Sequence, residues 1–284
     1  MYNRVDGEYT RPGQADELSR PADSIEFAQT LTEVARRESL PSDESVERMG
    51  LCFSKPHTSD AIESSPSTSR HSTSSLSSSS EVSSAASSVR DLFDYRTAEL
   101  SEANVSGICV GLVAEWLLSL PSSPSSRSSS SSRMRALLPG TENHSSAARR
   151  QGQYEQVATL LKEDGAEGSH NRQAKSTMLR DAGLEPSGEQ TGYRFGTSSR
   201  IDKIVKEVTQ DASRYWVRLN FVGGGGHSIA TATSNGTTTL FDPNYGEFAV
   251  APDRVGGLFK SLAERYSSPP NNLDIATVVT QKIT

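Results

Sequence analysis

The chain has 284 residues, of which 33% are hydrophobic and 23% are charged, and its formal net charge at pH 7 is −6. This acidic balance leaves no broad basic surface for nucleic acid, and the apolar runs are far too short to cross a bilayer. Because the apolar content is low and the serine tracts are long, only part of the chain can bury a core. We therefore expect one compact domain preceded by a disordered region.

The first 90 residues form two polar segments. Residues 1–49 carry one short amphipathic pattern, at 24–38, that predicts a local helix. From Ser54 to Ser88 roughly every second residue is serine, and such a segment cannot bury enough apolar surface to offset its chain entropy. We expect residues 50–90 to form a disordered tether and residues 91–284 to hold the compact domain.

The compact domain combines helical and strand-like patterns. Apolar periodicity predicts helices at 108–119, 146–163, 171–182, 200–211 and 253–266, and strands at 214–222, 227–234, 237–242 and 273–283. Helices followed mainly by strands predict an α+β fold with an antiparallel sheet. A second serine tract, Ser122–Ser132, interrupts this pattern, and we expect it to be an extended surface loop.

The helix predicted to start at residue 108 is apolar almost all round, which is typical of a buried central helix. It opens with Gly-Ile-Cys-Val-Gly, so that Cys109 lies in its first turn, where the positive end of the helix dipole favours the reactive thiolate. The alternative is that Cys109 is a small apolar core residue, as many cysteines are. Its partners elsewhere in the chain decide between the two interpretations.

A hairpin signal places a histidine and an aspartate on neighbouring strands. The Asn-Gly pair at 235–236 favours a two-residue type I′ turn. In the register that this turn sets, Asp242 lies opposite Ile229, so that His227 and Asp242 project from the same face within reach of a hydrogen bond. The alternative is an ordinary strand histidine after the glycine run 223–226, and an aspartate that starts a turn.

The order Cys109, His227, Asp242 is that of a thiol nucleophile, a base and the carboxylate that orients the base. An oxyanion would be met by the backbone N–H of Cys109 and by a side-chain donor, for which Asn104 is the nearest candidate, although a cap or loop asparagine is the alternative there. Four other histidines lie in polar surroundings and receive no role: His57, His71, His144 and His170. We expect no metal site and no cofactor.

In these residues the chain resembles the YopT/AvrPphB family of bacterial type III effector cysteine proteases, and in particular its rhizobial members. The resemblance runs from about Asp91 to the C-terminus and carries over Cys109 as nucleophile, His227 as base, Asp242 as third member and Asn104 as oxyanion donor. It implies a papain-like catalytic domain at 91–284 and type III secretion into a host cell. It also implies cleavage of host signalling proteins, such as cytoplasmic receptor-like kinases or small GTPases. We expect a monomer that binds no nucleic acid.

The resemblance also gives a meaning to one motif outside the domain. Residues 49–54, Met-Gly-Leu-Cys-Phe-Ser, fit a myristoylation signal that is inert until a cut between Met49 and Gly50 frees the glycine. Plant-associated members of the family cut themselves near the N-terminus and are then acylated, which implies that residues 1–49 are a propeptide or secretion region. One myristoyl chain binds a membrane only marginally, so Cys52 is the expected palmitoylation site. Host acyltransferases are then partners, and the acyl chains place the protein at the host plasma membrane.

Two other functions stay open. The same three residue types serve other acyl-transfer enzymes, such as transglutaminases and deamidases, through the same thioester. Alternatively, the chain is a non-enzymatic interaction protein whose serine-rich segment binds host proteins or is phosphorylated by them. A broken peptide bond distinguishes the protease from both.

Overall fold

An antiparallel sheet of seven strands organises the computed structural model, which describes residues 90–120 and 128–284. In spatial order the strands are β1 (Arg96–Glu99), β6 (Gly246–Val250), β5 (Thr237–Asp242), β4 (Gly226–Ser234), β3 (Ser213–Phe221), β7 (Ile275–Ile283) and β2 (Pro186–Arg194). The helices are α2 (Cys109–Ser119), α3 (Ser130–Ala136), α4 (Glu142–Glu163), α5 (His170–Asp181), α6 (Ser198–Val208) and α7 (Val255–Ser267), with 3₁₀ turns η1 (Leu92–Tyr95) and η2 (Pro252–Arg254). This is the α+β organisation that the sequence predicts.

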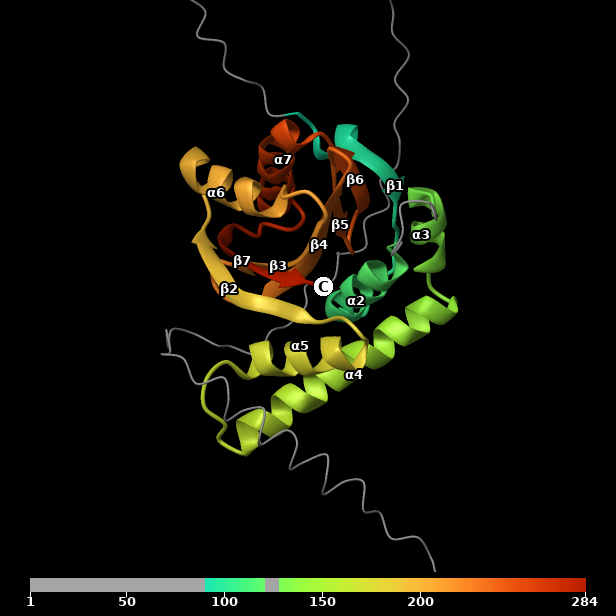
Figure 1. Cartoon of the computed structure of the whole chain (residues 1–284), viewed down its shortest axis with the longest axis vertical. Coiled ribbons are helices and arrows are strands. Elements are labelled where there is room, and N and C mark those ends of the chain that lie inside the picture. The colour runs from blue at the N-terminus through green and yellow to red at the C-terminus, as the bar shows by residue number, and fades with distance from the viewer. Residues whose placement is uncertain (1–89, 121–127) are drawn as a thin grey trace, which may run out of the picture. The chain divides into compact units, whose positions relative to one another are not determined.

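Helices cover both faces of the sheet (Figure 1). On one face α6 and α7 bury an apolar core that includes Ile204 of α6, Leu262 of α7 and Val217 of β3. On the other face α2 packs against β4 and β5, α4 packs against α2, and α5 packs against α4. Because each fully buried apolar side chain contributes about 1.5–3 kcal/mol, these two contact layers hold the helices that carry the candidate site.

The hairpin formed by β4 and β5 has the predicted turn. Asn235 and Gly236 both have positive φ, at 51° and 69°, as a type I′ turn requires, and Ser234 pairs with Thr237. The ladder ends at the pair Ala230–Phe241, so the predicted backbone pairing of Asp242 with Ile229 is wrong. Asp242 pairs instead with Gly246 of β6, because the chain turns back directly after β5.

Several elements escaped the sequence analysis. Strands β1, β2 and β6 lack a clear alternation and are held by pairing with neighbours rather than by their own pattern. The predicted surface loop at Ser122–Ser132 is wrong at its end, because Ser129 caps α3 and Ser130 begins it. The predicted helix at 24–38, the tether and the motif at 49–54 lie outside the described residues.

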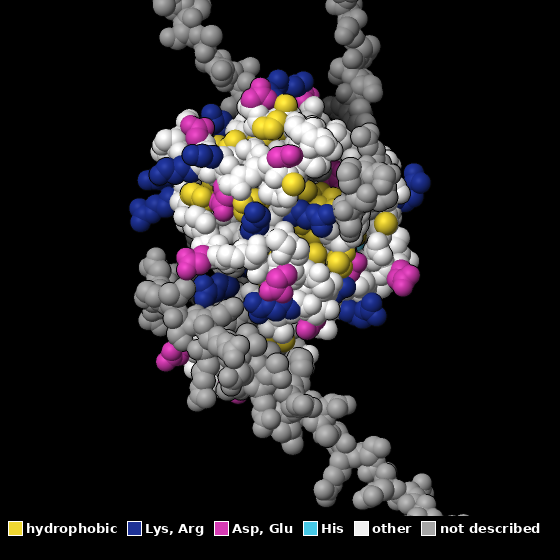
Figure 2. Space-filling model, viewed as in Figure 1, with side chains coloured by type: hydrophobic (Ala, Val, Ile, Leu, Met, Phe, Trp, Pro, Cys, Tyr) yellow, Lys and Arg dark blue, Asp and Glu magenta, His cyan; other side chains and the backbone are white. Residues whose placement is uncertain are grey.

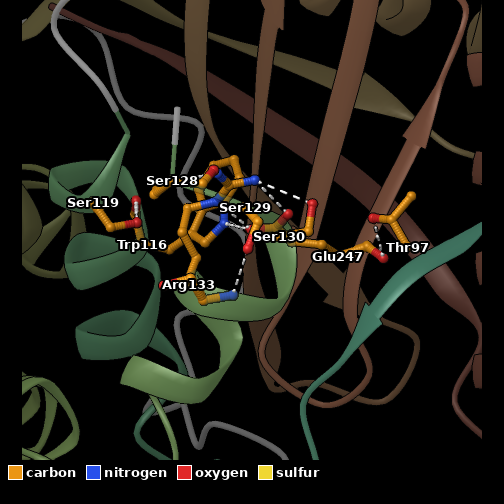
Figure 3. Close-up of polar contacts among 9 residues, drawn as sticks. Thr97, Trp116, Ser119, Ser128, Ser129, Ser130, Arg133 and Glu247 are labelled. Atoms are coloured by element: carbon orange, nitrogen blue, oxygen red, sulfur yellow. Dashed lines mark hydrogen bonds and ion pairs between the residues drawn. The ribbon is translucent and has the colours of Figure 1, made fainter. Parts of the chain in front are cut away.

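Buried polar contacts anchor α3 to the sheet and explain why a serine-rich segment becomes helical (Figure 3). Glu247 of β6 is fully buried, and its carboxylate accepts two hydrogen bonds of 2.7 Å from the guanidinium of Arg133 and one of 2.6 Å from the indole N–H of Trp116. The ring of Trp116 also stacks on Phe241 of β5, with centroids 5.2 Å apart. A buried carboxylate needs such donors. The ion pair between Arg133 and Glu247 therefore stabilises α3 despite the low helix propensity of its serines.

The surface carries charges of both signs. Figure 2 shows them spread over one face, with apolar side chains gathered near its middle. No helix within residues 90–120 and 128–284 combines the length and apolar character needed to cross a membrane.

Close packing fixes α2 on α4. A Cβ on Gly111 would lie 1.8 Å from the carbonyl oxygen of Ala147, so only glycine allows the two helices to approach this closely. On the same side, Glu115 of α2 accepts hydrogen bonds of 2.6 Å from Arg150 Nε and from Ser146 Oγ. The helix that begins at Cys109 is therefore held both by its backbone and by a buried ion pair.

We expect Gly111→Ala to lower the free energy of unfolding by about 2 kcal/mol or more, because the added methyl group meets backbone that cannot move alone. The matched control is Gly152→Ala, which is also in a helix and where the new Cβ meets nothing within 4 Å. This variant should raise the free energy of unfolding by about 0.5–1 kcal/mol, because alanine favours the helix more than glycine does. Urea denaturation of both variants measures the difference. Equal stabilities would contradict the proposed close contact.

Candidate active site

Cys109 lies in the first turn of α2, as predicted, although the helix begins at Cys109 itself and not at residue 108; its side chain is buried. The residue before the helix, Ile108, makes no side-chain cap. Gln151 of α4 takes this role, because its Oε1 accepts hydrogen bonds from the backbone N–H groups of Val110, at 3.1 Å, and Gly111, at 3.4 Å. A glutamine from a neighbouring helix thus satisfies two donors that a helix start leaves open, and it fixes the turn that carries the thiol.

His227 and Asp242 form a hydrogen-bonded pair. The distance from His227 Nε2 to Asp242 Oδ1 is 2.9 Å, and both side chains are 0% exposed. With the ring hydrogen at Nε2, the other ring nitrogen of a neutral imidazole is a proton acceptor. That nitrogen, Nδ1, is buried and has no hydrogen-bond partner among residues 90–120 and 128–284. α2 packs against the strands that carry both residues, so the fold brings the Cys109 helix to this pair.

Two further residues complete the surroundings of Asp242. Its Oδ1 also accepts the backbone N–H of Asn244 at 2.8 Å, and its Oδ2 accepts the hydroxyl of Tyr266 at 3.0 Å. The Tyr266 oxygen in turn accepts Asn244 Nδ2 at 3.1 Å, and the Tyr266 ring lies 5.7 Å from the His227 ring, measured between centroids. Donors from β4, from the turn after β5 and from α7 therefore converge on one buried carboxylate.

Burial, followed by the charge of Asp242, raises the pKa of Tyr266 well above its ordinary value of 10. Burial and the same carboxylate also raise the pKa of Tyr245 to about 12. Both phenols therefore stay neutral at physiological pH, and Tyr266 remains a hydrogen-bond donor to Asp242. The arrangement can hold an imidazole in one orientation and stabilise its protonated form, which is what a general base paired with a thiol requires.

Asn104 lies next to this network. Its Nδ2 donates to Asn244 Oδ1 at 2.7 Å, so the loop before α2 is tied to the turn after β5. His144, to which the sequence analysis gives no role, holds the same loop, since its Nε2 lies 3.0 Å from the carbonyl oxygen of Ala103. The structure thus places Asn104 in the site, and its oxyanion role stays a prediction.

Sequence reasoning missed Tyr266, Asn244 and Gln151. A signal existed for Asn244, which follows Asp242 by two residues in Asp-Pro-Asn-Tyr, where a carboxylate commonly accepts a nearby backbone N–H. Tyr266 and Gln151 lie on helices that contact the site only in three dimensions. Among the residues that the structure describes, no group of three or more His, Cys, Asp or Glu side chains could hold a metal ion.

Known proteins resemble the chain in both sequence and structure. The family described as Yersinia/Haemophilus virulence surface antigen (Peptidase_C58) matches residues 86–282. The YopT-like protein blr2058 of Bradyrhizobium diazoefficiens is 71% identical over 285 residues, which cover 100% of this chain and 93% of that protein. The cysteine protease avirulence protein AvrPphB of Pseudomonas savastanoi pv. phaseolicola is 31% identical over 191 residues, which cover 66% of this chain and 67% of that protein.

The crystal structure of the Pseudomonas avirulence protein AvrPphB superimposes on this chain with a TM-score of 0.61 and 27% sequence identity. The match covers 68% of this chain and 100% of the crystallised one. The family model covers most of the described residues, and a relative is similar along the whole of this chain. The chain therefore belongs to the YopT-like family of cysteine proteases (Peptidase_C58) and has its papain-like fold.

Proposed function

We propose that Cys109, His227 and Asp242 are the nucleophile, base and orienting carboxylate of this cysteine protease. The observation that carries the proposal is the buried His227–Asp242 hydrogen bond through Nε2, which leaves Nδ1 as the ring atom for proton exchange with the thiol. The position of Cys109 at the start of α2 supports the proposal, because the helix dipole favours a thiolate there.

In the proposed reaction, the Cys109 thiol gives its proton to His227 Nδ1, and the thiolate attacks the carbonyl carbon of the scissile peptide bond. The C–N bond of the resulting tetrahedral intermediate breaks as His227 returns the proton to the leaving amine. Water, deprotonated by the same imidazole, then hydrolyses the thioester and frees the thiol. Asp242 keeps its hydrogen bond to Nε2 and stabilises the imidazolium that forms in both steps.

The oxyanion of both tetrahedral intermediates would be met by the backbone N–H of Cys109 and by the amide of Asn104. The hydrogen bond between Asn104 and Asn244 supports this role, because it holds the amide beside the turn that also contacts Asp242. One network would then orient both the base and the oxyanion donor.

The chain itself is one proposed substrate. A cut between Met49 and Gly50 would remove residues 1–49 and expose the glycine of the motif at 49–54 for myristoylation, with Cys52 as the palmitoylation site. Dual acylation would place the enzyme at the host plasma membrane, where the proposed targets are signalling proteins such as cytoplasmic receptor-like kinases or small GTPases. The avirulence role named for AvrPphB and the virulence antigens named for the family support delivery into a host cell, for which we propose type III secretion.

Purified wild-type protein is expected to begin at Gly50, and Cys109→Ala and His227→Ala to stay full length, because loss of a catalytic residue slows such reactions by about 10³-fold or more. His170→Ala is the matched control, since this histidine contacts the Ala166 carbonyl, and it should process normally. Intact mass and N-terminal sequencing in a reducing buffer measure the outcome. A Cys109→Ala protein that still begins at Gly50 would rule out the proposed self-cleavage, whereas a modified glutamine without a broken peptide bond would favour the acyl-transfer alternative.

Tyr266→Phe should lower the rate of Cys109 inactivation by the thiol-directed inhibitor E-64 about tenfold, because Asp242 loses one of its hydrogen-bond donors. Tyr193→Phe is the control, since that hydroxyl donates at 2.7 Å to Glu207 on α6 and plays no part in the network. Inactivation kinetics at equal protein concentration provide the comparison. A similar loss in both variants would show that Tyr266 acts only through general stability.

Incubation of the processed protein with host acyltransferases should add a myristoyl group to Gly50, and Gly50→Ala should abolish the addition. Cys52→Ser should keep the myristoyl group but release the protein from membranes on washing, because a single myristoyl chain binds with a constant of only about 10⁴ M⁻¹. Mass spectrometry and membrane fractionation separate the two steps. Stable membrane binding of Cys52→Ser would refute the need for a second acyl chain at this position.

A further inference from the structure

The outward side of α6 is basic. Its side chains toward the core, among them Ile201 and Ile204, are buried, whereas Arg200, Lys203 and Lys206 are exposed. Figure 2 shows Lys and Arg side chains along the edge of the domain where Figure 1 places α6 and β2. A helix with this pattern presents a strip of positive charge to whatever lies outside it.

A fourth cation extends this strip onto the sheet. Lys282 of β7 pairs with Tyr215 of β3, whose side chain belongs to the apolar core under α6, so Lys282 lies on the same face of the sheet as α6. Two residues before Lys282, the hydroxyl of Thr280 donates to Glu207 of α6 at 2.8 Å. Lys282 is itself exposed. We define the α6 basic face by four residues: Arg200, Lys203, Lys206 and Lys282.

No ion pair within residues 90–120 and 128–284 neutralises a cation of the α6 basic face. Exposed cations elsewhere on the domain do pair with acids, as in Arg180–Glu185 at 3.2 Å. Of the two acids on α6, Glu207 already accepts hydrogen bonds from two hydroxyl groups, at 2.7 and 2.8 Å. Asp202 is the exposed acid of this helix. The α6 basic face therefore keeps an excess of positive charge.

The start of the domain lies close to the α6 basic face. The carbonyl oxygen of Arg90 accepts the hydroxyl of Ser261 on α7, and α7 packs against α6. The proposed acylation sites, Gly50 and Cys52, precede Arg90 by about 40 residues, and a flexible serine-rich chain of this length spans about 35 Å. An acylated protein would thus keep α6 within reach of the lipid surface that holds its acyl chains.

Contact through α6 would not cover the proposed catalytic residues. α2, which begins at Cys109, packs on the face of the sheet opposite to α6 (Figure 1). On the α6 side, Thr233 Oγ1 donates at 2.8 Å to the carbonyl oxygen of Val208, the last residue of α6. Thr233 lies about 20 Å along β4 from His227. The C-terminal end of α6 is therefore far from the imidazole.

We propose that the α6 basic face docks the catalytic domain on an anionic lipid surface, such as the cytoplasmic leaflet of the host plasma membrane. The inference deepens the proposed membrane location and rests on it. The acyl chains would hold the protein at the membrane, and the contact through α6 would orient the domain there. Charge complementarity carries the proposal, because anionic headgroups attract Lys and Arg side chains that come within about 8 Å of the surface.

The proposed cut after Met49 would favour this contact. Residues 1–49 hold 11 Asp and Glu residues but 6 Lys and Arg residues, so they carry five of the six net negative charges of the chain. After their removal the protein is nearly neutral, and its overall repulsion from an anionic surface falls.

Sedimentation of unacylated protein with lipid vesicles tests the α6 basic face. Protein expressed from the full chain without host acyltransferases should bind phosphatidylcholine vesicles that contain about 30% phosphatidylserine, but not phosphatidylcholine alone. Raising the salt from about 0.05 M to about 0.3 M should release it, because the Debye length falls. Lys203→Glu/Lys206→Glu should weaken binding about 25-fold or more, because each cation near such a surface strengthens binding about fivefold.

Two further double variants complete the test. Arg149→Glu/Lys162→Glu makes the same change in net charge at exposed positions of α4 and should bind nearly as wild type does. Lys203→Gln/Lys206→Gln, in which glutamine preserves helix propensity, should show an intermediate loss. An equal loss in the α4 variant would overturn the assignment to α6. Failure of the wild type to prefer anionic vesicles would overturn lipid as the occupant and leave an acidic protein surface as the alternative.

Reaction with the inhibitor E-64 separates this proposal from the proposed function. All three double variants should react with E-64 at the wild-type rate, because none of their positions belongs to the proposed active site. Anionic-vesicle binding by a wild-type protein that neither cleaves itself nor reacts with E-64 would overturn the protease mechanism and support the α6 basic face. Normal self-cleavage without vesicle binding would overturn the α6 basic face alone.

Discussion

The buried carboxylate of Asp242 is the constraint on which the rest of this structure depends. A fully buried carboxylate is costly unless donors surround it, and here the donors come from three separate parts of the chain. His227 is supplied by β4, the backbone N–H of Asn244 by the turn after β5, and the hydroxyl of Tyr266 by α7. The β4–β5 hairpin and α7 must therefore come together at Asp242, and the hydrogen bond to Asp242 fixes the orientation of the His227 imidazole.

Cys109, the proposed nucleophile, is positioned by a different set of contacts on the opposite face of the sheet. α2 is held between the sheet and α4, through the stacking of Trp116 on Phe241 and the close approach at Gly111. Gln151 and Glu247 add polar contacts to its two ends, one at the backbone of the first turn and one at the indole of Trp116. Because dense packing and satisfied hydrogen bonds allow little movement, the thiol and the imidazole belong to two rigid layers that meet at the site.

The buried polar networks of this fold determine where its helices and strands lie more than they add to its stability. A buried ion pair such as Arg133–Glu247 contributes little net free energy compared with an apolar contact of the same size, yet it defines where α3 lies relative to β6. The same reasoning applies to the chain of hydrogen bonds from Asn104 through Asn244 and Tyr266 to Asp242.

Local sequence determined the parts of this protein that depend on near neighbours. The apolar run after residue 108 specifies a buried helix with Cys109 in its first turn, and Asn235-Gly236 specifies the hairpin that brings His227 and Asp242 to one face, because period and turn chemistry act over a few residues. Tertiary structure alone decided three features: the hydrogen bonds that Tyr266 donates and Gln151 accepts, the pairing of β1, β2 and β6, and the helical end of the serine tract. Those features arise from contacts between residues far apart in the chain, where burial and the need to satisfy polar groups outweigh local propensity.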